Sequence, residues 1–185
     1  MKNRIAKKVC AAALAGLMTM ALVPTSVFAA GTMTIGVTSF ADTLEPTEQY
    51  FSWVISRYGV GQGLTRFDEE GNMVPCLATE WTNSEDGKTW TFTIREGVKF
   101  SNGNDMTPEL VKASLERTIE MSNRVPEFFD IDSIEVDGQN IIFNLNRANA
   151  NMAGSLADPL FLIVDTNVDD STFAMEGPIL SLIHI

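Results

Sequence analysis

The side chains of this chain that could perform acid–base, nucleophilic or metal chemistry are few and scattered. The single histidine, His184, stands second from the C-terminus of the 185 residues. Catalysis by a Ser-His-Asp or Cys-His group and zinc binding by several histidines are therefore not expected. Cys76 lies in the apolar stretch 74–78 without a histidine or basic residue beside it, so we expect a buried, unreactive thiol.

The acidic residues do not form a catalytic or metal-binding pattern either. Asp165, Asn167 and Asp169 alternate as at the start of a calcium loop, but Asp170 replaces the glycine that such a loop requires. Other local groups lie in or beside expected turns, where solvated charges are usual: Glu69 with Glu70, Asp130 with Asp132, and Asp169 with Asp170. We therefore predict that the protein is not an enzyme and has no cofactor or metal site.

The N-terminal stretch has the three parts of an export signal. Four basic residues within the first eight precede a mostly apolar run over 9–23, which is followed by Pro24 and small residues up to Ala29. This order is typical of a cleaved secretory signal, and the apolar run is short for a membrane-spanning helix. We predict a signal peptide over 1–29 and an exported protein, located in the periplasm or at the cell surface outside the cytoplasmic membrane.

The charge balance excludes one class of partner. The chain carries 13 Lys and Arg against 24 Asp and Glu, a formal net charge of -11, and the signal peptide would remove four of the positive charges. A nucleic-acid binder needs a basic face for phosphate contacts, so no nucleic-acid partner is expected. The acidic surface also repels anionic lipid.

Hydrophobic patterning predicts short strands, tight turns and a few helices. Asp86-Gly87 and Asp137-Gly138 each join two alternating segments, which indicates two hairpins. Thr107-Pro108 is a helix start with Thr107 as N-cap, and Thr47 is a similar N-cap candidate. The fold class is thus α+β, dominated by antiparallel hairpins. The predicted strands cover 32–38, 64–67, 77–82, 89–95, 98–100, 131–136 and 140–145, and the predicted helices cover 47–58, a stretch from 107, and 149–156.

Three sequence blocks resemble the extracytoplasmic solute-binding proteins of ABC transporters, in the peptide/nickel-binding family, family 5. They are GLTRFDEEGNMVPCLATEW at 63–81, SEDGKTWTFTIREGVKFSNG at 84–103, and the helix that starts at Thr107 and ends in SLER at 114–117. Leu44-Glu45-Pro46 is similar to a Leu-Asp-Pro of the family near the mature N-terminus. The order of the blocks makes the resemblance specific, and it extends over most of residues 33–165.

This resemblance implies part of a two-lobed, periplasmic-binding-protein-like fold that closes around its ligand by hinge motion. Residues 30–63 would supply the opening strand and helix of lobe one, and residues 64–179 an incomplete, family-specific extra domain of that lobe. Family members have roughly three times the mature length present here, so an N-terminal fragment is expected. Residues 180–185 resemble an in-frame translation of a transposase end from sequencing libraries, and we expect them to be an artefact.

The resemblance also implies a ligand cleft, for which this chain offers four substrate-binding candidates. Ser39 and Phe40 follow the first predicted strand, and Tyr50 and Trp53 belong to the predicted helix over 47–58. The alternative is that Phe40, Tyr50 and Trp53 are ordinary core residues.

The function implied is the substrate-binding component of an ABC uptake transporter. It would act as a monomer that binds a small peptide or similar solute and delivers it to the permease subunits. Nickel or metal-chelate binding within the same family is the first alternative; the lack of a native histidine and Leu160, rather than an arginine, after Pro159 favour the peptide reading. An exported structural domain without a small ligand is the second alternative.

Overall fold

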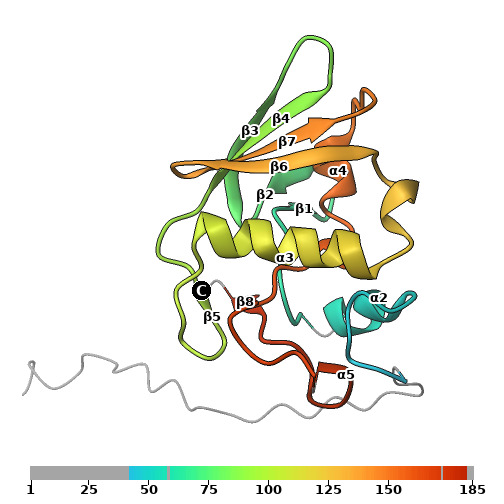
Figure 1. The fold of residues 1–185 in the computed structure, drawn as a ribbon, viewed down its shortest axis with the longest axis vertical. Coiled ribbons are helices and arrows are strands. Elements are labelled where there is room, and N and C mark those ends of the chain that lie inside the picture. The colour runs from blue at the N-terminus through green and yellow to red at the C-terminus, as the bar shows by residue number, and fades with distance from the viewer. Residues whose placement is uncertain (1–41, 58, 172, 183–185) are drawn as a thin grey trace, which may run out of the picture. The chain divides into compact units, whose positions relative to one another are not determined.

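The computed structural model describes residues 42–57, 59–171 and 173–182, and the fold below refers to these residues (Figure 1). The predicted signal peptide over 1–29, the predicted strand over 32–38, and the candidates Ser39 and Phe40 lie outside the described residues.

Four antiparallel strands form the central sheet, in the order β3-β4-β7-β6 (Figure 1). Its members are β3 (Ala78–Asn83), β4 (Thr89–Ile94), β6 (Ile131–Asp137) and β7 (Asn140–Leu145). β3 with β4 and β6 with β7 are hairpins, and β4 pairs with β7 to join them. Both hairpins predicted from the Asp-Gly pairs are confirmed.

The second hairpin shows why a glycine follows the aspartate. Asp137 pairs with Asn140, which leaves Gly138 and Gln139 as a two-residue loop. Gly138 has φ of 57°, a backbone conformation that an L side chain adopts only under strain. A two-residue loop with a positive φ at its first position suits the right-handed twist of the two strands.

Helix α3 (Pro108–Met121) covers the buried face of the sheet and packs against β6 and β7 (Figure 1). The Thr107 side chain accepts a hydrogen bond from the backbone N–H of Leu110, as expected for the N-cap. The sheet presents alternate residues to the helix, because successive side chains of a strand point to opposite faces. The buried set is Trp90, Phe92 and Ile94 on β4, Ile141, Phe143 and Leu145 on β7, and Val111 and Leu115 on α3.

Smaller elements surround this core. β1 (Thr65–Phe67) pairs with β2 (Met73–Pro75), a strand that the sequence analysis did not predict. β5 (Lys99–Phe100) pairs with β8 (Ser181–Leu182). The short helices are α2 (Phe51–Ser56), η1 (Val125–Glu127), α4 (Met152–Ser155), η2 (Pro159–Phe161) and α5 (Phe173–Glu176).

The second predicted N-cap is wrong. Helix α2 begins at Phe51, four residues after the start of the predicted range 47–58, and Tyr50 occupies the cap position without a side-chain hydrogen bond. Thr47 is instead buried, and its hydroxyl donates a hydrogen bond of 2.6 Å to the Glu45 carboxylate. Because the Thr47 hydroxyl is engaged by the buried Glu45 carboxylate, it does not cap the N-terminus of α2.

The apolar run over 160–164 divides its side chains between two clusters. Phe161 and Ile163 belong to the main core beneath the sheet, whereas Leu162 and Val164 belong to a smaller cluster with Ile55, Phe173 and Leu180. We call the smaller group the satellite cluster. Leu180 is almost fully buried in the satellite cluster. The expectation that residues 180–185 are an artefact stays a prediction.

Candidate ligand-binding site

The two candidate aromatics that the structure describes lie on the surface. Tyr50 directly precedes α2 and is 60% exposed, and Trp53 in the first turn is 43% exposed. The opposite side of the helix is buried through Ser52 and Ile55. Tyr50 and Trp53 are therefore exposed aromatics rather than core residues in this structure, and exposed aromatic groups are frequent at binding sites.

Arg124, which the sequence analysis missed, lies directly against Tyr50. Its guanidinium carbon is 4.0 Å from the centroid of the Tyr50 ring and 5.6 Å from that of Phe128. Nη1 donates to the backbone carbonyl of Gln49 at 3.1 Å. Nε is buried and lacks a hydrogen-bond acceptor in the described part of the chain, since the Glu127 carboxylate is 3.8 Å away. Arg124 thus combines cation–π contacts with an unused donor.

A second arginine fixes the segment that leads into α2. Arg117, in the third turn of α3, donates from Nη1 and Nη2 to the two oxygens of Glu45, at 3.1 and 2.8 Å. Its Nε donates to Asp170 at 3.0 Å, and its guanidinium also lies over the Phe173 ring. The bidentate geometry is the strong form of an arginine–carboxylate contact.

These contacts decide the charge state of the pair. Burial favours the neutral form of Glu45, but hydrogen bonds from Arg117 and Thr47 outweigh burial and lower the pKa of the carboxyl. For Arg117, burial acts to lower the pKa, and the contacts with Glu45 and Asp170 outweigh it and raise the pKa. Both groups therefore remain charged at neutral pH.

Trp53 lines a surface hollow of about 380 Å³ beside α2. Phe67 from β1, Phe128 after η1 and Pro159 from η2 supply the other large apolar walls, and Asp158 and Asn151 supply polar groups. Phe67 is itself 54% exposed. At Gly154, also in the lining, the Asn151 amide approaches the backbone so closely that a Cβ atom would have to displace this exposed side chain.

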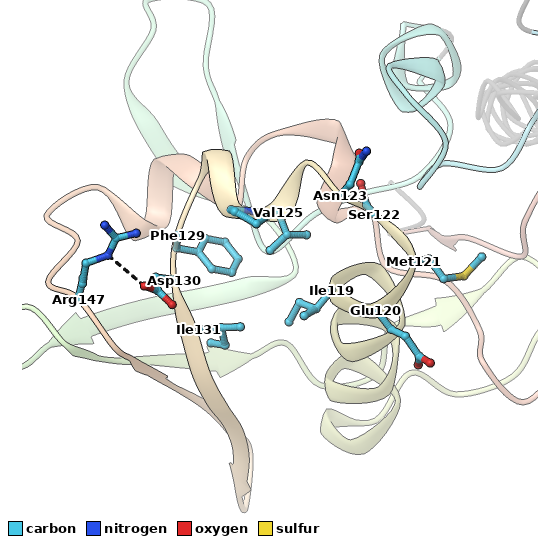
Figure 2. Close-up of a pocket in the computed structure, with 11 residues that line it drawn as sticks. Ile119, Glu120, Met121, Ser122, Asn123, Val125, Phe129, Asp130, Ile131 and Arg147 are labelled. Atoms are coloured by element: carbon cyan, nitrogen blue, oxygen red, sulfur yellow. Dashed lines mark hydrogen bonds and ion pairs between the residues drawn. The ribbon is translucent and has the colours of Figure 1, made fainter.

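A larger hollow of about 540 Å³ lies where α3 ends and β6 begins (Figure 2). Its sides include Ile119, Val125 and Phe129, and an ion pair of 3.0 Å between Arg147 and Asp130 crosses its edge (Figure 2). Neither Tyr50 nor Trp53, the two candidates that the structure describes, lines it.

Cys76 and Asp165 are held in environments that account for them without a role in ligand binding. Burial raises the pKa of the Cys76 thiol, and the nearby charges of Arg66 and Arg95, which the sequence analysis did not anticipate, oppose this effect without reversing it. Asp165 accepts hydrogen bonds from Asn102 and Asn104 at 2.9 and 2.7 Å.

The resemblance of 165–176 to a calcium loop extends to Glu176, which stands at the twelfth position. The carboxylate of Asp165, at the first position, is nevertheless held by the two asparagine amides. No group of three or more His, Cys, Asp or Glu residues that could hold a metal ion occurs among residues 42–57, 59–171 and 173–182.

Comparison with known protein families gives a direct assignment. The model described as "Bacterial extracellular solute-binding proteins, family 5 Middle" matches residues 72–181, more than half of the chain. The chain belongs to the bacterial extracellular solute-binding proteins of family 5. The family resemblance read from the three sequence blocks is thereby confirmed.

Individual relatives of family 5 differ in what their names say they bind. The nickel-binding periplasmic protein of Escherichia coli K12 is 42% identical over 65 residues, which are 35% of this chain and 12% of that protein. The glutathione-binding protein GsiB of Escherichia coli K12 is 34% identical over 110 residues, 58% of this chain and 21% of that protein. The chain thus spans about an eighth to a fifth of the length of these two curated relatives.

Solved structures agree with the assignment to family 5. A nickel ABC transporter protein from Bacillus halodurans matches with a TM-score of 0.66 and 34% identity, over 71% of this chain and 28% of that chain. The predicted fold class is confirmed, since such neighbours are two-lobed periplasmic binding proteins and the described residues combine helices with antiparallel sheets.

The sequence signals for the two arginines were unequal. Arg117 ends the SLER block and Glu45 belongs to the Leu44-Glu45-Pro46 motif, so both positions were visible in the sequence, but their pairing was not. Arg124 stands in no motif. Its nearest sequence clue is the isolated basic residue among apolar and acidic neighbours in 119–129.

Proposed function

We propose that this protein is the substrate-binding component of an ABC uptake transporter, which binds a solute outside the membrane and delivers it to permease subunits. The observation that carries the proposal is the match of residues 72–181 to family 5. The exposed Tyr50 and Trp53, with the Arg124 guanidinium over the Tyr50 ring, support a ligand contact on this part of the chain. Ser39 and Phe40, which precede this segment, are proposed to contact the same ligand.

The proposed ligand is a peptide or a similar small solute. A relative named for glutathione binding supports this choice, and aromatic side chains next to an arginine suit a ligand with apolar and anionic groups. Nickel or a nickel chelate is the second candidate, because the E. coli K12 and B. halodurans relatives are named for nickel.

Calorimetry on the full-length protein separates the two candidates. We expect heat of binding and a thermal shift with members of a panel of short peptides, and no comparable signal with nickel chloride plus L-histidine. If only nickel with histidine gives a signal, the ligand is a nickel chelate and not a peptide. No binding in either series would contradict solute binding itself.

The cellular setting follows the same proposal. The protein would be exported by cleavage near Ala29, would act as a monomer and would carry out no catalysis. Among the helices that the structure describes, none is long and apolar enough to cross a membrane. N-terminal sequencing of the exported product is expected to show a start near residue 30, and an uncleaved N-terminus would contradict the signal peptide.

A further inference from the structure

The hollow beside Trp53 is lined by groups that attract positive charge. Three aromatic residues, Trp53, Phe67 and Phe128, contribute to its walls, and among the described residues that line it Asp158 is the one that carries a charge. No lysine or arginine of residues 42–57, 59–171 or 173–182 belongs to its lining. Aromatic faces carry negative electrostatic potential, so aromatic rings and a carboxylate attract the same kind of charge.

The Asp158 carboxylate has capacity for a ligand. Its Oδ1 accepts the backbone N–H of Leu160 at 2.9 Å, which caps η2 and fixes the side chain. Its Oδ2 accepts no hydrogen bond from the residues that the structure describes. An ionised carboxylate has about four acceptor sites, so most of its capacity remains open.

Two positive charges must be weighed, Arg124 and Arg57, the latter four positions after Trp53 at the end of α2. Arg124 contacts the Phe128 ring at 5.6 Å but does not line the hollow. Its charge is partly balanced by Glu127, whose carboxylate is 3.8 Å from the Arg124 Nε. With Asp158 included, Arg57, Arg124, Glu127 and Asp158 together carry no net charge, so the wider field is set by the chain as a whole, which is at -11. The field therefore favours a cation.

We propose that this hollow binds an organic cation, an ammonium or guanidinium group with apolar substituents, by aromatic contacts with Trp53 and Phe67 and an ion pair with Asp158. The inference rests on the proposed function in so far as the cation is a part of the transported solute. The binding itself is a property of the hollow, and it is measured separately.

The test uses choline and its uncharged carbon isostere, 3,3-dimethylbutan-1-ol, as probes on the complete chain at constant ionic strength. We expect choline to shift the NMR signals of the Trp53 indole and of residues 151–158, and the isostere to leave them unchanged. Equal responses to both probes, or choline shifts confined to other residues, would overturn the proposal.

Two variants of residues that line the hollow, and one control variant elsewhere, test which side chains contribute to choline binding. Asp158→Asn keeps an oxygen for the Leu160 N–H, so the cap and fold are retained, while the charge is lost; we expect choline to bind at least fivefold more weakly. Asp132→Asn removes an exposed carboxylate on β6 and is expected to change binding less than twofold. Phe67→Leu retains apolar area without the aromatic face and is expected to weaken binding as well.

Failure of this inference and failure of the proposed function give different results. If the full-length protein binds peptides or a nickel chelate but the hollow does not distinguish choline from its isostere, the proposed function stands and the cation site falls. If choline binding depends on Asp158 while no transported solute is found, the hollow is a cation site without the proposed role.

Discussion

Two arginines, Arg117 in α3 and Arg124 just before η1, hold the segment that precedes α2. The first binds the Glu45 carboxylate and the second the Gln49 carbonyl and the Tyr50 ring. Arg117 lies within α3, whereas Arg124 lies after the helix has ended at an extended Ser122 and occupies the N-cap of η1, so two separate elements hold this segment. The positions of Tyr50 and Trp53 therefore depend on charged contacts rather than on a large apolar interface.

Substitution of Arg117 should expose this dependence. In Arg117→Met the Glu45 carboxylate, whose side chain is 5% exposed, loses its charge partner. Breaking one side of a buried ion pair costs about 3–5 kcal/mol, so the urea midpoint should fall strongly. As the control, Arg147→Met removes a surface pair in which the arginine side chain is 79% exposed, and it should cost less than about 1 kcal/mol. Equal losses in the two variants would refute the argument.

Protonation of Asp165 at low pH should lower the stability of the fold. Burial favours its neutral form, but hydrogen bonds from Asn102, Asn104 and the Asn167 N–H outweigh burial and lower its pKa below the ordinary value of 3.8. A carboxyl whose pKa is lower in the folded state stabilises the fold above its unfolded pKa and loses that contribution as pH falls through the folded pKa. The contribution should be constant near pH 7 and decline below about pH 4.5.

The variant Asp165→Asn isolates this contribution. At pH 7 it replaces one of the two accepting oxygens by an NH2 group, which faces an N–H donor whichever way the amide is turned, and we expect a loss of about 1–3 kcal/mol. The difference in unfolding free energy between wild type and variant should shrink as pH is lowered from 5 to 3. A difference that is independent of pH over this range would show that the Asp165 charge does not contribute.

At the scale of single elements, α3 is defined by local signals. Thr107 and Pro108 mark its start, and the acidic Glu109 lies in the first turn, where the helix dipole favours a negative charge. Replacing Thr107 by Ala should cost about 1 kcal/mol in urea unfolding, because the Leu110 N–H loses its acceptor. Thr107→Ser should retain most of the stability. If both variants unfold like the wild type, the cap has no energetic role.

The sequence could predict those elements that depend on local signals, as α3 does. The hairpins and α3 depend on neighbouring residues: an Asp-Gly loop, alternating apolar positions, or a cap beside a proline. β2 and the start of α2 depend on distant ones, since β2 forms only against β1 and Thr47 is engaged by Glu45. Trp53 was found because it is aromatic, whereas Arg124 and Asp158 gain their surroundings only after residues 50–67, 124–128 and 151–159 meet in space.

At the scale of the whole described chain, the run over 160–164 connects two cores of unequal size. The main core contains the sheet and α3, and the satellite cluster joins α2, α5 and the segment at Leu180. The satellite cluster has few members, so its local opening should require less free energy than unfolding of the main core. The candidate aromatics Tyr50 and Trp53 belong to the part that opens more easily.

Two phenylalanine variants test this hierarchy by hydrogen exchange. Phe143→Ala removes a fully buried ring from the main core, and we expect a loss of about 3–5 kcal/mol with faster exchange throughout the sheet. Phe173→Ala removes a ring of the satellite cluster that also contacts the Arg117 guanidinium. We expect faster exchange in 43–56 and 173–180, with β4 and β7 still protected. Uniform loss of protection in Phe173→Ala would mean that the two clusters unfold as one unit, and that the surface bearing Tyr50 and Trp53 is as rigid as the sheet.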